Sequence, residues 1–280
     1  MVEESIGMIP LPMKNMCFRL IALPLLFVVL ATSRTWAQDK PFEPVSGQPG
    51  KDVVWVPTPQ ELVEKMLDMA KVTPQDIVID LGSGDGRNVI AAAKRGARAF
   101  GFEFNPDMVA LSRRRAKEAG VSDRATFIEG DMFEADISKA TVLALFLLPS
   151  NLDKLAPKFL TLKPGTRIVN NTFNVTGWEA DQSETIEGSC TSWCTSMLNI
   201  VPARVAGTWR MGSGDLTLTQ NFQMVTGTLG TNAVTGRLNG EQISFKVGDT
   251  QYTGKVSGDR MEGTATTAGK TQNWSATRAK

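Results

Sequence analysis

The sequence lacks histidine altogether, and it has little of several other residue types that carry chemistry. Its 280 residues contain no His, one Tyr and three Cys. Without histidine, a Ser-His-Asp triad, a Cys-His pair, a zinc site with His ligands and a His-ligated haem are all excluded. The charges nearly cancel, since 30 Lys and Arg residues balance 29 Asp and Glu residues for a net charge of +1. We therefore expect no nucleic acid partner, because binding to phosphates needs a basic surface.

The N-terminal region has an apolar run that is too short to span a membrane comfortably. The run covers 20–31 and contains Pro24, whereas a spanning helix needs about 20 apolar residues. A basic start from Met13, this apolar core and a small-residue exit at Ala37 form the pattern of a signal peptide. We interpret residues 1–37 as a signal peptide with an upstream extension before Met13. The mature protein is then expected to be periplasmic or secreted, with membrane contact only through the N-terminal segment.

Two of the three cysteines, Cys190 and Cys194, lie outside the signal region and close together in the sequence. In an oxidising compartment such a pair can close a small disulfide loop. Two free thiols are the alternative, and the sequence does not decide between them. A metal site would need more ligands than this neighbourhood offers, so no metal is predicted.

The sequence predicts an α/β domain over 53–203, after a Pro- and Gly-rich linker at 38–52. Short apolar runs alternate with amphipathic segments to about residue 180, which indicates a parallel sheet covered on both faces. The residues Thr58 to Glu61 have the pattern of a capping box for a first helix. Further helices are predicted at 88–95 and from Asn105 to Gly120. The predicted strands are 77–81, 98–103, 125–129, 141–147 and 166–171.

A second domain of antiparallel strands is predicted over 204–280. Turn signals recur about every ten residues there, with no helical pattern between them. We expect a small antiparallel β-barrel or sandwich with Trp209 and Trp274 closing its core. The predicted strands are 216–220, 224–229, 234–238, 242–247, 251–256, 261–266 and 273–277.

The segment 78–87, Val-Ile-Asp-Leu-Gly-Ser-Gly-Asp-Gly-Arg, is the most informative motif of the chain. It takes a predicted strand into a glycine-rich turn and then into a helix. A dinucleotide-binding fingerprint would need glycine at the position of Arg87, so a nicotinamide cofactor is not favoured. The acidic Asp80 at the end of the strand suits a cationic ligand instead, because its carboxylate can meet an ammonium group.

This segment resembles the first motif of the class I S-adenosylmethionine-dependent methyltransferases. The resemblance implies a Rossmann-like fold and S-adenosylmethionine as the cofactor. It continues in order along the chain, where Glu103 matches the acid that takes the ribose hydroxyls and Asp131 the acid that receives the adenine amino group. The cofactor-binding residues implied in this way are Asp80, Gly82, Ser83, Gly84, Gly86, Glu103, Asp131, Met132 and Thr58, with Thr58 at the methionine end.

Within that class, residues 53–180 are similar to the small mitochondrial protein-lysine methyltransferases and to their bacterial relatives. The mitochondrial enzymes act on the ATP synthase c subunit and on the adenine nucleotide translocase. The similarity implies that the segment 146–149, with Leu148 and Pro149, borders the channel where the methyl acceptor enters. Asn171, at the end of the last predicted strand of this domain, and Phe173, just after it, are further candidates for this channel. No residue is assigned as a catalytic base.

The predicted function is methyl transfer from S-adenosylmethionine to a protein lysine or another amine. A small-molecule methyltransferase, with the barrel helping to hold an apolar substrate, is an alternative. A second alternative is an exported protein that binds an adenosyl ligand or a partner without turnover. The predicted export conflicts with the cytosolic origin of the cofactor, and the oligomeric state is not predicted.

Overall fold

The computed structural model describes residues 42–188 and 190–279. The predicted signal peptide at 1–37 and the first residues of the predicted linker lie outside this range. Within the described residues, none of the helices has the length and apolar character needed to cross a membrane.

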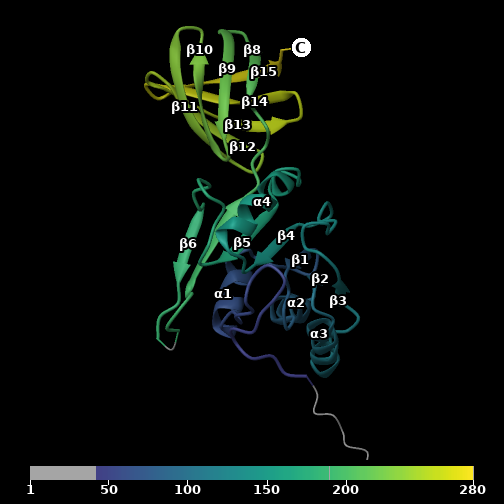
Figure 1. The fold of residues 1–280 in the computed structure, drawn as a ribbon. Coiled ribbons are helices and arrows are strands. Elements are labelled where there is room, and N and C mark those ends of the chain that lie inside the picture. The colour runs from purple at the N-terminus through teal and green to yellow at the C-terminus, as the bar shows by residue number, and fades with distance from the viewer. Residues whose placement is uncertain (1–41, 189, 280) are drawn as a thin grey trace, which may run out of the picture. The chain divides into compact units, whose positions relative to one another are not determined.

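The α/β part of the chain contains four helices and seven strands among the described residues (Figure 1). In chain order they are α1 (Gln60–Met69), β1 (Ile77–Leu81), α2 (Arg87–Lys94), β2 (Arg98–Glu103), α3 (Pro106–Glu118), β3 (Ala125–Glu129), β4 (Val142–Leu145), α4 (Pro149–Phe159), β5 (Arg167–Asn171), β6 (Gln182–Thr185) and β7 (Thr195–Ile200). The five predicted strands are present, and three of them have the predicted bounds. The sequence did not indicate α4, β6 or β7.

The seven strands form one mixed sheet in the order β3-β2-β1-β4-β5-β7-β6. The first five of these strands run parallel, as predicted. The prediction of a parallel sheet is wrong at one edge, where β7 runs antiparallel to β5 and pairs with β6 as a hairpin. The strand order switches sides at β1, since β2 and β3 lie on one side of it and β4 and β5 on the other. Ligands of such sheets bind at this switch point, beyond the carboxyl ends of the strands.

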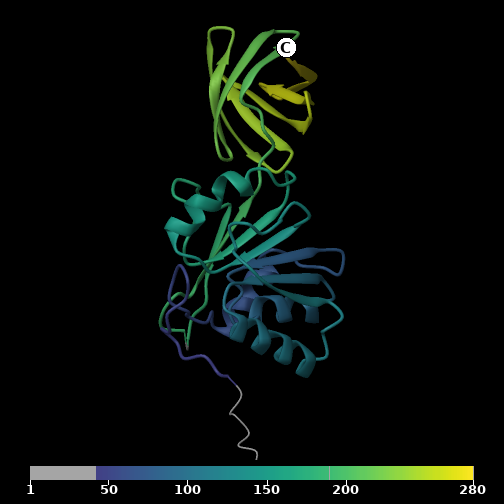
Figure 2. The same cartoon turned by 45° about the vertical axis from the view of Figure 1, so that its right-hand side comes forward.

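Each face of the sheet carries its own apolar core. On one face, buried residues of α1, α2 and α3 pack against alternate residues of the strands. On the other face, α4 and the segment after β3 pack against the remaining strand residues. Figures 1 and 2 show α2 and α3 side by side on the first of these faces. Because successive residues of a central strand enter opposite cores and both cores are buried, the central strands are continuous apolar runs in the sequence.

The helix ends follow the sequence signals in one case and depart from them in another. The side chain of Asn105 caps α3 by accepting hydrogen bonds from the amides of Asp107 and Met108, and Pro106 occupies the first turn. The predicted capping box at the start of α1 is wrong, because Pro59 occupies the cap position and no side chain caps the helix. The hydroxyl of Thr58 accepts a hydrogen bond from Asn171 instead.

The C-terminal part is a closed barrel of eight antiparallel strands, one more than predicted. The additional strand, β8, contains Trp209, which is fully buried in the barrel core. Trp274 also packs in this core, as predicted. The strands are β8 (Gly207–Met211), β9 (Gly214–Asn221), β10 (Met224–Leu229), β11 (Asn232–Asn239), β12 (Gln242–Val247), β13 (Thr250–Ser257), β14 (Arg260–Thr267) and β15 (Lys270–Arg278).

Candidate functional site

A cavity of about 260 Å³ lies at the carboxyl ends of the central strands β1, β2 and β4. It brings together residues that are up to 145 positions apart in the sequence, from Gln48 to Trp193. Most of the residues predicted for the site line this cavity: Thr58, Asp80, Gly82, Ser83, Gly84, Glu103, Asp131, Met132, Leu148 and Phe173. Gly86, Pro149 and Asn171 are not among the lining residues.

The glycine-rich turn after β1 forms the floor of the cavity. Gly82 and Gly84 have φ values of 71° and 55°, a conformation that residues with a Cβ adopt at a cost. A Cβ on Gly84 would also lie 2.6 Å from the indole nitrogen of Trp55. The turn therefore needs glycine for its backbone conformation and, at Gly84, for the close approach of the Trp55 indole.

Asp80 is a buried carboxyl at the edge of the cavity, with 3% of its surface exposed. Its Oδ2 accepts a hydrogen bond of 3.1 Å from Nδ2 of Asn88. Among the described residues, no lysine or arginine pairs with it. Burial raises the pKa of Asp80 well above its ordinary value, Asn88 acts against this, and the charges of Glu103 and Asp85 raise it further. A bound cation at this end of the cavity would stabilise the ionised carboxylate.

Glu103 ends β2 and faces the cavity with both carboxylate oxygens held by backbone amides. Its Oε2 accepts from the amide of Gly84 at 2.9 Å, and its Oε1 accepts from the amide of Asn105 at 2.9 Å. A carboxylate has about four lone-pair sites, so each oxygen retains capacity for one more donor. The arrangement suits a ligand that offers two hydroxyl groups.

Asp131 lies at the far end of the cavity, after β3. Lys51 donates to its Oδ2 at 2.6 Å, and the same ammonium lies 4.6 Å from the centroid of the Phe104 ring. This hydrogen bond from Lys51 holds the pKa of Asp131 below its ordinary value, and the amide of Phe133 adds to the effect. The carboxylate is thus an acceptor at the rim of the cavity.

The predicted linker at 38–52 is part of this site rather than a spacer. Its residues from Gln48 onwards line the cavity together with 53–58. Hydrogen bonds between Gln48 and Trp55, and between Gly47 and Trp55, close the segment into a short loop. Its Pro and Gly content indicated a spacer, whereas the structure packs it beside Trp55, just after the predicted linker.

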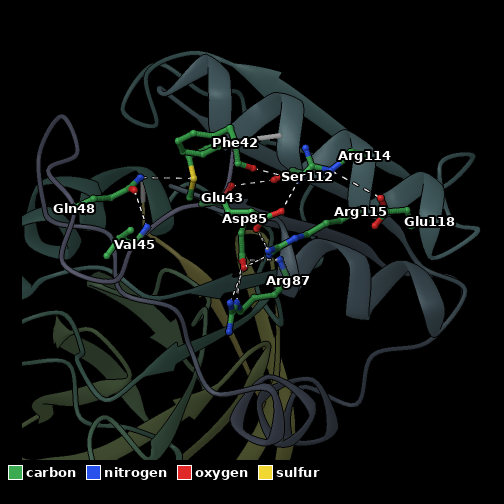
Figure 3. A network of polar contacts seen from close by, with 12 residues as sticks. Phe42, Glu43, Val45, Gln48, Asp85, Arg87, Ser112, Arg114, Arg115 and Glu118 are labelled. Atoms are coloured by element: carbon green, nitrogen blue, oxygen red, sulfur yellow. Dashed lines mark hydrogen bonds and ion pairs between the residues drawn. The ribbon is translucent and has the colours of Figure 1, made fainter. Parts of the chain in front are cut away.

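A network of charged side chains ties this N-terminal segment to the glycine-rich turn and to α3 (Figure 3). The buried carboxylate of Asp85 accepts from Arg87 at 2.6 Å and from Arg115 at 2.5 Å. Burial by itself would raise the pKa of Asp85, but the two guanidinium groups outweigh it and hold the pKa below its ordinary value. Arg115 also pairs with Glu43, and Arg87 donates to the carbonyl of Thr58. The network therefore positions both the turn and Thr58.

The three predicted residues outside the cavity lining have other roles in the fold. Gly86 precedes α2, where a Cβ would meet the Phe127 ring at 2.7 Å. Pro149 is exposed and begins α4. Asn171 is fully buried, and its Nδ2 donates to the hydroxyl of Thr58 at 3.2 Å. The structure thus places Asn171 in contact with Thr58 and outside the cavity lining.

The opposite end of the cavity is apolar and aromatic. Leu148 and Phe173, two of the residues predicted for the acceptor channel, line it together with Phe146 and Trp193. Trp193 was not predicted; it lies in a short loop that a disulfide between Cys190 and Cys194 closes. The disulfide decides between the alternatives that the sequence left open for these cysteines. Within 42–188 and 190–279 no group of three or more potential ligand side chains could hold a metal ion.

The cavity fits the cofactor that the sequence resemblance implies. Asp80 offers an uncompensated buried carboxylate for the cationic methionine end, Glu103 offers two partly free oxygens for the ribose hydroxyls, and Asp131 offers an acceptor for the adenine amino group. The glycine turn allows the close approach of the ligand. S-adenosylmethionine supplies an electrophilic methyl group when bound.

Comparison with known proteins agrees with this geometry. Residues 80–182 match the family described as the ANTKMT methyltransferase domain. A protein-lysine N-methyltransferase of Saccharolobus islandicus is 43% identical over 138 residues, which cover 48% of this chain and 86% of that protein. The adenine nucleotide translocase lysine N-methyltransferase of Mus musculus is 37% identical over 119 residues, which cover 42% of this chain and 52% of that relative.

A solved structure agrees as well. An RNA methyltransferase from Salinibacter ruber in complex with S-adenosyl-L-homocysteine is 46% identical and covers 54% of this chain and 96% of its own, with a TM-score of 0.50. The residues that match the family, 80–182, contain the glycine-rich turn and the three acids of the cavity. The chain therefore belongs to the family of class I S-adenosylmethionine-dependent methyltransferases that the ANTKMT methyltransferase domain represents.

Proposed function

We propose that this methyltransferase modifies the ε-amino group of a lysine residue in a protein. The observation that carries the proposal is the composition of the two ends of one cavity. Acidic side chains line the end that suits the cofactor, and apolar and aromatic side chains line the end where an acceptor would enter. The relatives from Saccharolobus islandicus and Mus musculus are named as lysine methyltransferases, which supports the same acceptor.

For methyl transfer to an amine, the protein must align the amine with the methyl group and allow the amine to lose a proton. Attack by an amine on a methyl sulfonium is an in-line displacement, so the protein must hold the two groups in line and exclude water. A lysine with a pKa of about 10.4 is neutral only rarely at pH 7, at a cost of roughly 4 to 5 kcal/mol. The apolar lining formed by Phe146, Leu148 and Phe173 helps to exclude water from this end of the cavity. The chain has no histidine to serve as a base.

An RNA acceptor is the second candidate, because the relative from Salinibacter ruber is named as an RNA methyltransferase. The net charge of +1 favours a protein acceptor, since RNA binding draws on a basic surface.

The test is a transfer assay with a methyl-labelled donor. The full chain is incubated with the protein and the RNA of the same cells, and the labelled product is digested and identified by mass spectrometry. We expect the label on the side chain of a lysine. Label in RNA, or no transfer by a protein that binds the cofactor, would reject the lysine proposal.

We also propose that the protein is exported, on two grounds. The pattern at 1–37 is that of a signal peptide, and the disulfide between Cys190 and Cys194 is a bond that persists in oxidising compartments. Fractionation of cells followed by thiol labelling of the two cysteines tests this. Chain found in the cytosolic fraction with free thiols would overturn the proposal and remove the conflict with the cytosolic origin of the cofactor.

A further inference from the structure

The loop between β6 and β7 brings an exposed tryptophan to the acceptor end of the cavity. Trp193 has 43% of its surface exposed and lines the cavity. It immediately precedes Cys194, whose sulfur is bonded to Cys190. An exposed tryptophan at the rim of a cavity is the kind of residue that contacts a ligand or partner.

Trp193 extends a row of aromatic rings at this rim. Its ring centroid lies 6.1 Å from that of Phe146 with an interplanar angle of 57°, and Phe146 lies 6.3 Å from Phe173 with an angle of 15°. The three residues come from segments next to β4, β5 and β7, which are neighbours in the sheet. Three aromatic rings from three segments therefore form one continuous surface, here called the aromatic wall.

The backbone of Trp193 is held in an uncommon conformation. Its φ is 56°, in the left-handed region that bulky residues rarely adopt. The base of the loop is fixed, because the amide of Ile186 donates to the carbonyl of Cys194 at 2.9 Å. Both cysteines also pack against the apolar core beneath α1. The disulfide and this core thus hold Trp193 at the cavity. Without them, the loop would relax to a more common backbone conformation.

An aromatic wall recognises a particular kind of ligand. The faces of aromatic rings attract alkylammonium groups, and tryptophan does so most strongly. The aliphatic stem of a lysine also packs well against flat rings. We infer that Trp193 is a specificity-determining residue that binds the side chain of the acceptor lysine through the aromatic wall, and that the Cys190–Cys194 disulfide positions it.

This inference rests on the proposed lysine acceptor, so its test uses binding rather than turnover. The full chain, saturated with S-adenosylhomocysteine, is titrated calorimetrically with an Nε-trimethyl-lysine peptide and with the neutral isostere in which carbon replaces the side-chain nitrogen. We expect the cation to bind about fivefold more tightly than the neutral isostere. The preference should be lost in Trp193→Ala and largely kept in Trp193→Phe.

A second pair of variants separates the ring from the loop. In the double variant Cys190→Ser with Cys194→Ser, Trp193 is present but its loop is open, so we expect a reduced preference. Ile128→Ala, an exposed apolar side chain outside the cavity lining, should behave as the wild type. All variants should bind S-adenosylhomocysteine within about twofold of the wild type, which shows that they are folded.

The outcomes distinguish this inference from the proposed function. A cation preference that persists in Trp193→Ala, or a wild type that binds the two peptides equally, would overturn the role of Trp193. A full preference in the cysteine double variant would overturn the role of the disulfide. A cation preference that depends on Trp193, with no methyl transfer to any protein lysine, would instead reject the proposed function and leave the binding role standing.

Discussion

The backbone amide of Gly84 donates a hydrogen bond of 2.9 Å to Oε2 of Glu103. This contact joins the glycine-rich turn after β1 to the end of β2, so the carboxylate that faces the ribose position also fixes the turn. A charged acceptor makes such a bond roughly twice as strong as a neutral one. Glu103 is therefore expected to act on cofactor binding in two ways, as a direct acceptor and as a support of the turn.

Replacing Glu103 by Gln should weaken cofactor binding strongly. The amide has one acceptor oxygen where the carboxylate has two, so Gly84, Asn105 and the ligand hydroxyls can no longer all be satisfied. We expect the Kd for S-adenosylhomocysteine to rise roughly tenfold to hundredfold, measured by calorimetric titration. Glu129→Gln is the matched control, since it ends the neighbouring strand opposite Glu103 and does not line the cavity. An equal effect of the two substitutions would contradict this account.

Replacing Asp80 by Asn should separate stability from binding. Burial is the main reason for the raised pKa of Asp80 in the folded state. A raised pKa means that the carboxyl contributes stability fully below its unfolded value of about 3.9, and that this contribution is lost as the pH rises through the folded value. Without cofactor, Asp80→Asn should therefore have a Tm equal to or above that of the wild type at pH 8, and the difference should shrink at pH 5.

The same substitution should abolish tight cofactor binding. In the wild type, binding of the cationic methionine end requires an ionised Asp80, so affinity should fall as the pH drops below the raised pKa. Asp80→Asn should bind weakly and without this pH dependence. Titrations in buffers of different ionisation enthalpy would measure the proton released by the wild type on binding. Wild-type affinity that is constant from pH 5 to pH 8 would count against the role of Asp80.

The network around Asp85 predicts a large loss of stability when its acid is removed. Asp85→Ala leaves the guanidinium groups of Arg87 and Arg115 without their buried partner. Because both arginines are partly exposed and can regain water, we expect a loss of about 2 to 4 kcal/mol in the free energy of unfolding, measured in urea. Asp123→Ala, which removes an exposed pair with Arg124, should change it by less than about 1 kcal/mol.

The pH dependence of this effect has a fixed sign. The folded-state pKa of Asp85 is lowered because its arginine partners outweigh its burial. Its stabilising contribution is therefore present above the unfolded pKa of about 3.9 and is lost as the pH falls through the folded value. The gap in unfolding free energy between the wild type and Asp85→Asn should be constant from pH 8 to pH 5 and should close at lower pH. A gap that widens on acidification would be inconsistent with the ion pairs.

The sequence predicted the parts of this fold that depend on local signals. The strands at 77–81, 98–103 and 125–129 have the predicted bounds, because their apolar runs are closed by glycine turns or by helix caps such as Asn105. The segment at Thr58 shows the limit of local signals, since its hydroxyl bonds to Asn171, which lies 113 residues away. The sheet edge was missed for a similar reason: β6 is short and largely exposed, so it has no apolar run to mark it.

The candidate site was predictable where the resemblance to a family placed residues at strand ends. Asp80, Glu103 and Asp131 line one cavity because neighbouring parallel strands end at the same edge of the sheet. Arg115 and Trp193 could not be found in this way. An arginine on a polar helix indicates a solvated face, and only the fold reveals the buried Asp85 beneath it. Trp193 reaches the cavity because of the hairpin of β6 and β7, which the sequence did not indicate, and of a disulfide, which the sequence left as one of two alternatives.

Gly86 provides the last prediction, because the sequence assigns it to the cofactor and the structure assigns it to packing. A Cβ at this position would lie 2.7 Å from Cε1 of Phe127 and 2.9 Å from Cβ of Ser112, and the φ of Gly86 is 80°. Gly86→Ala therefore combines backbone strain with overpacking, and we expect a loss of about 2 to 4 kcal/mol in the free energy of unfolding.

The control isolates strain from packing. Gly165 has a φ of 92° and open space around the position of a Cβ, so Gly165→Ala should cost only the backbone strain, about 1 to 2 kcal/mol. Both variants should bind S-adenosylhomocysteine with a Kd close to that of the wild type at a temperature where they are folded, because neither glycine lines the cavity. A rise in the Kd of Gly86→Ala alone, with unchanged stability, would show that this glycine acts in cofactor binding and not in packing.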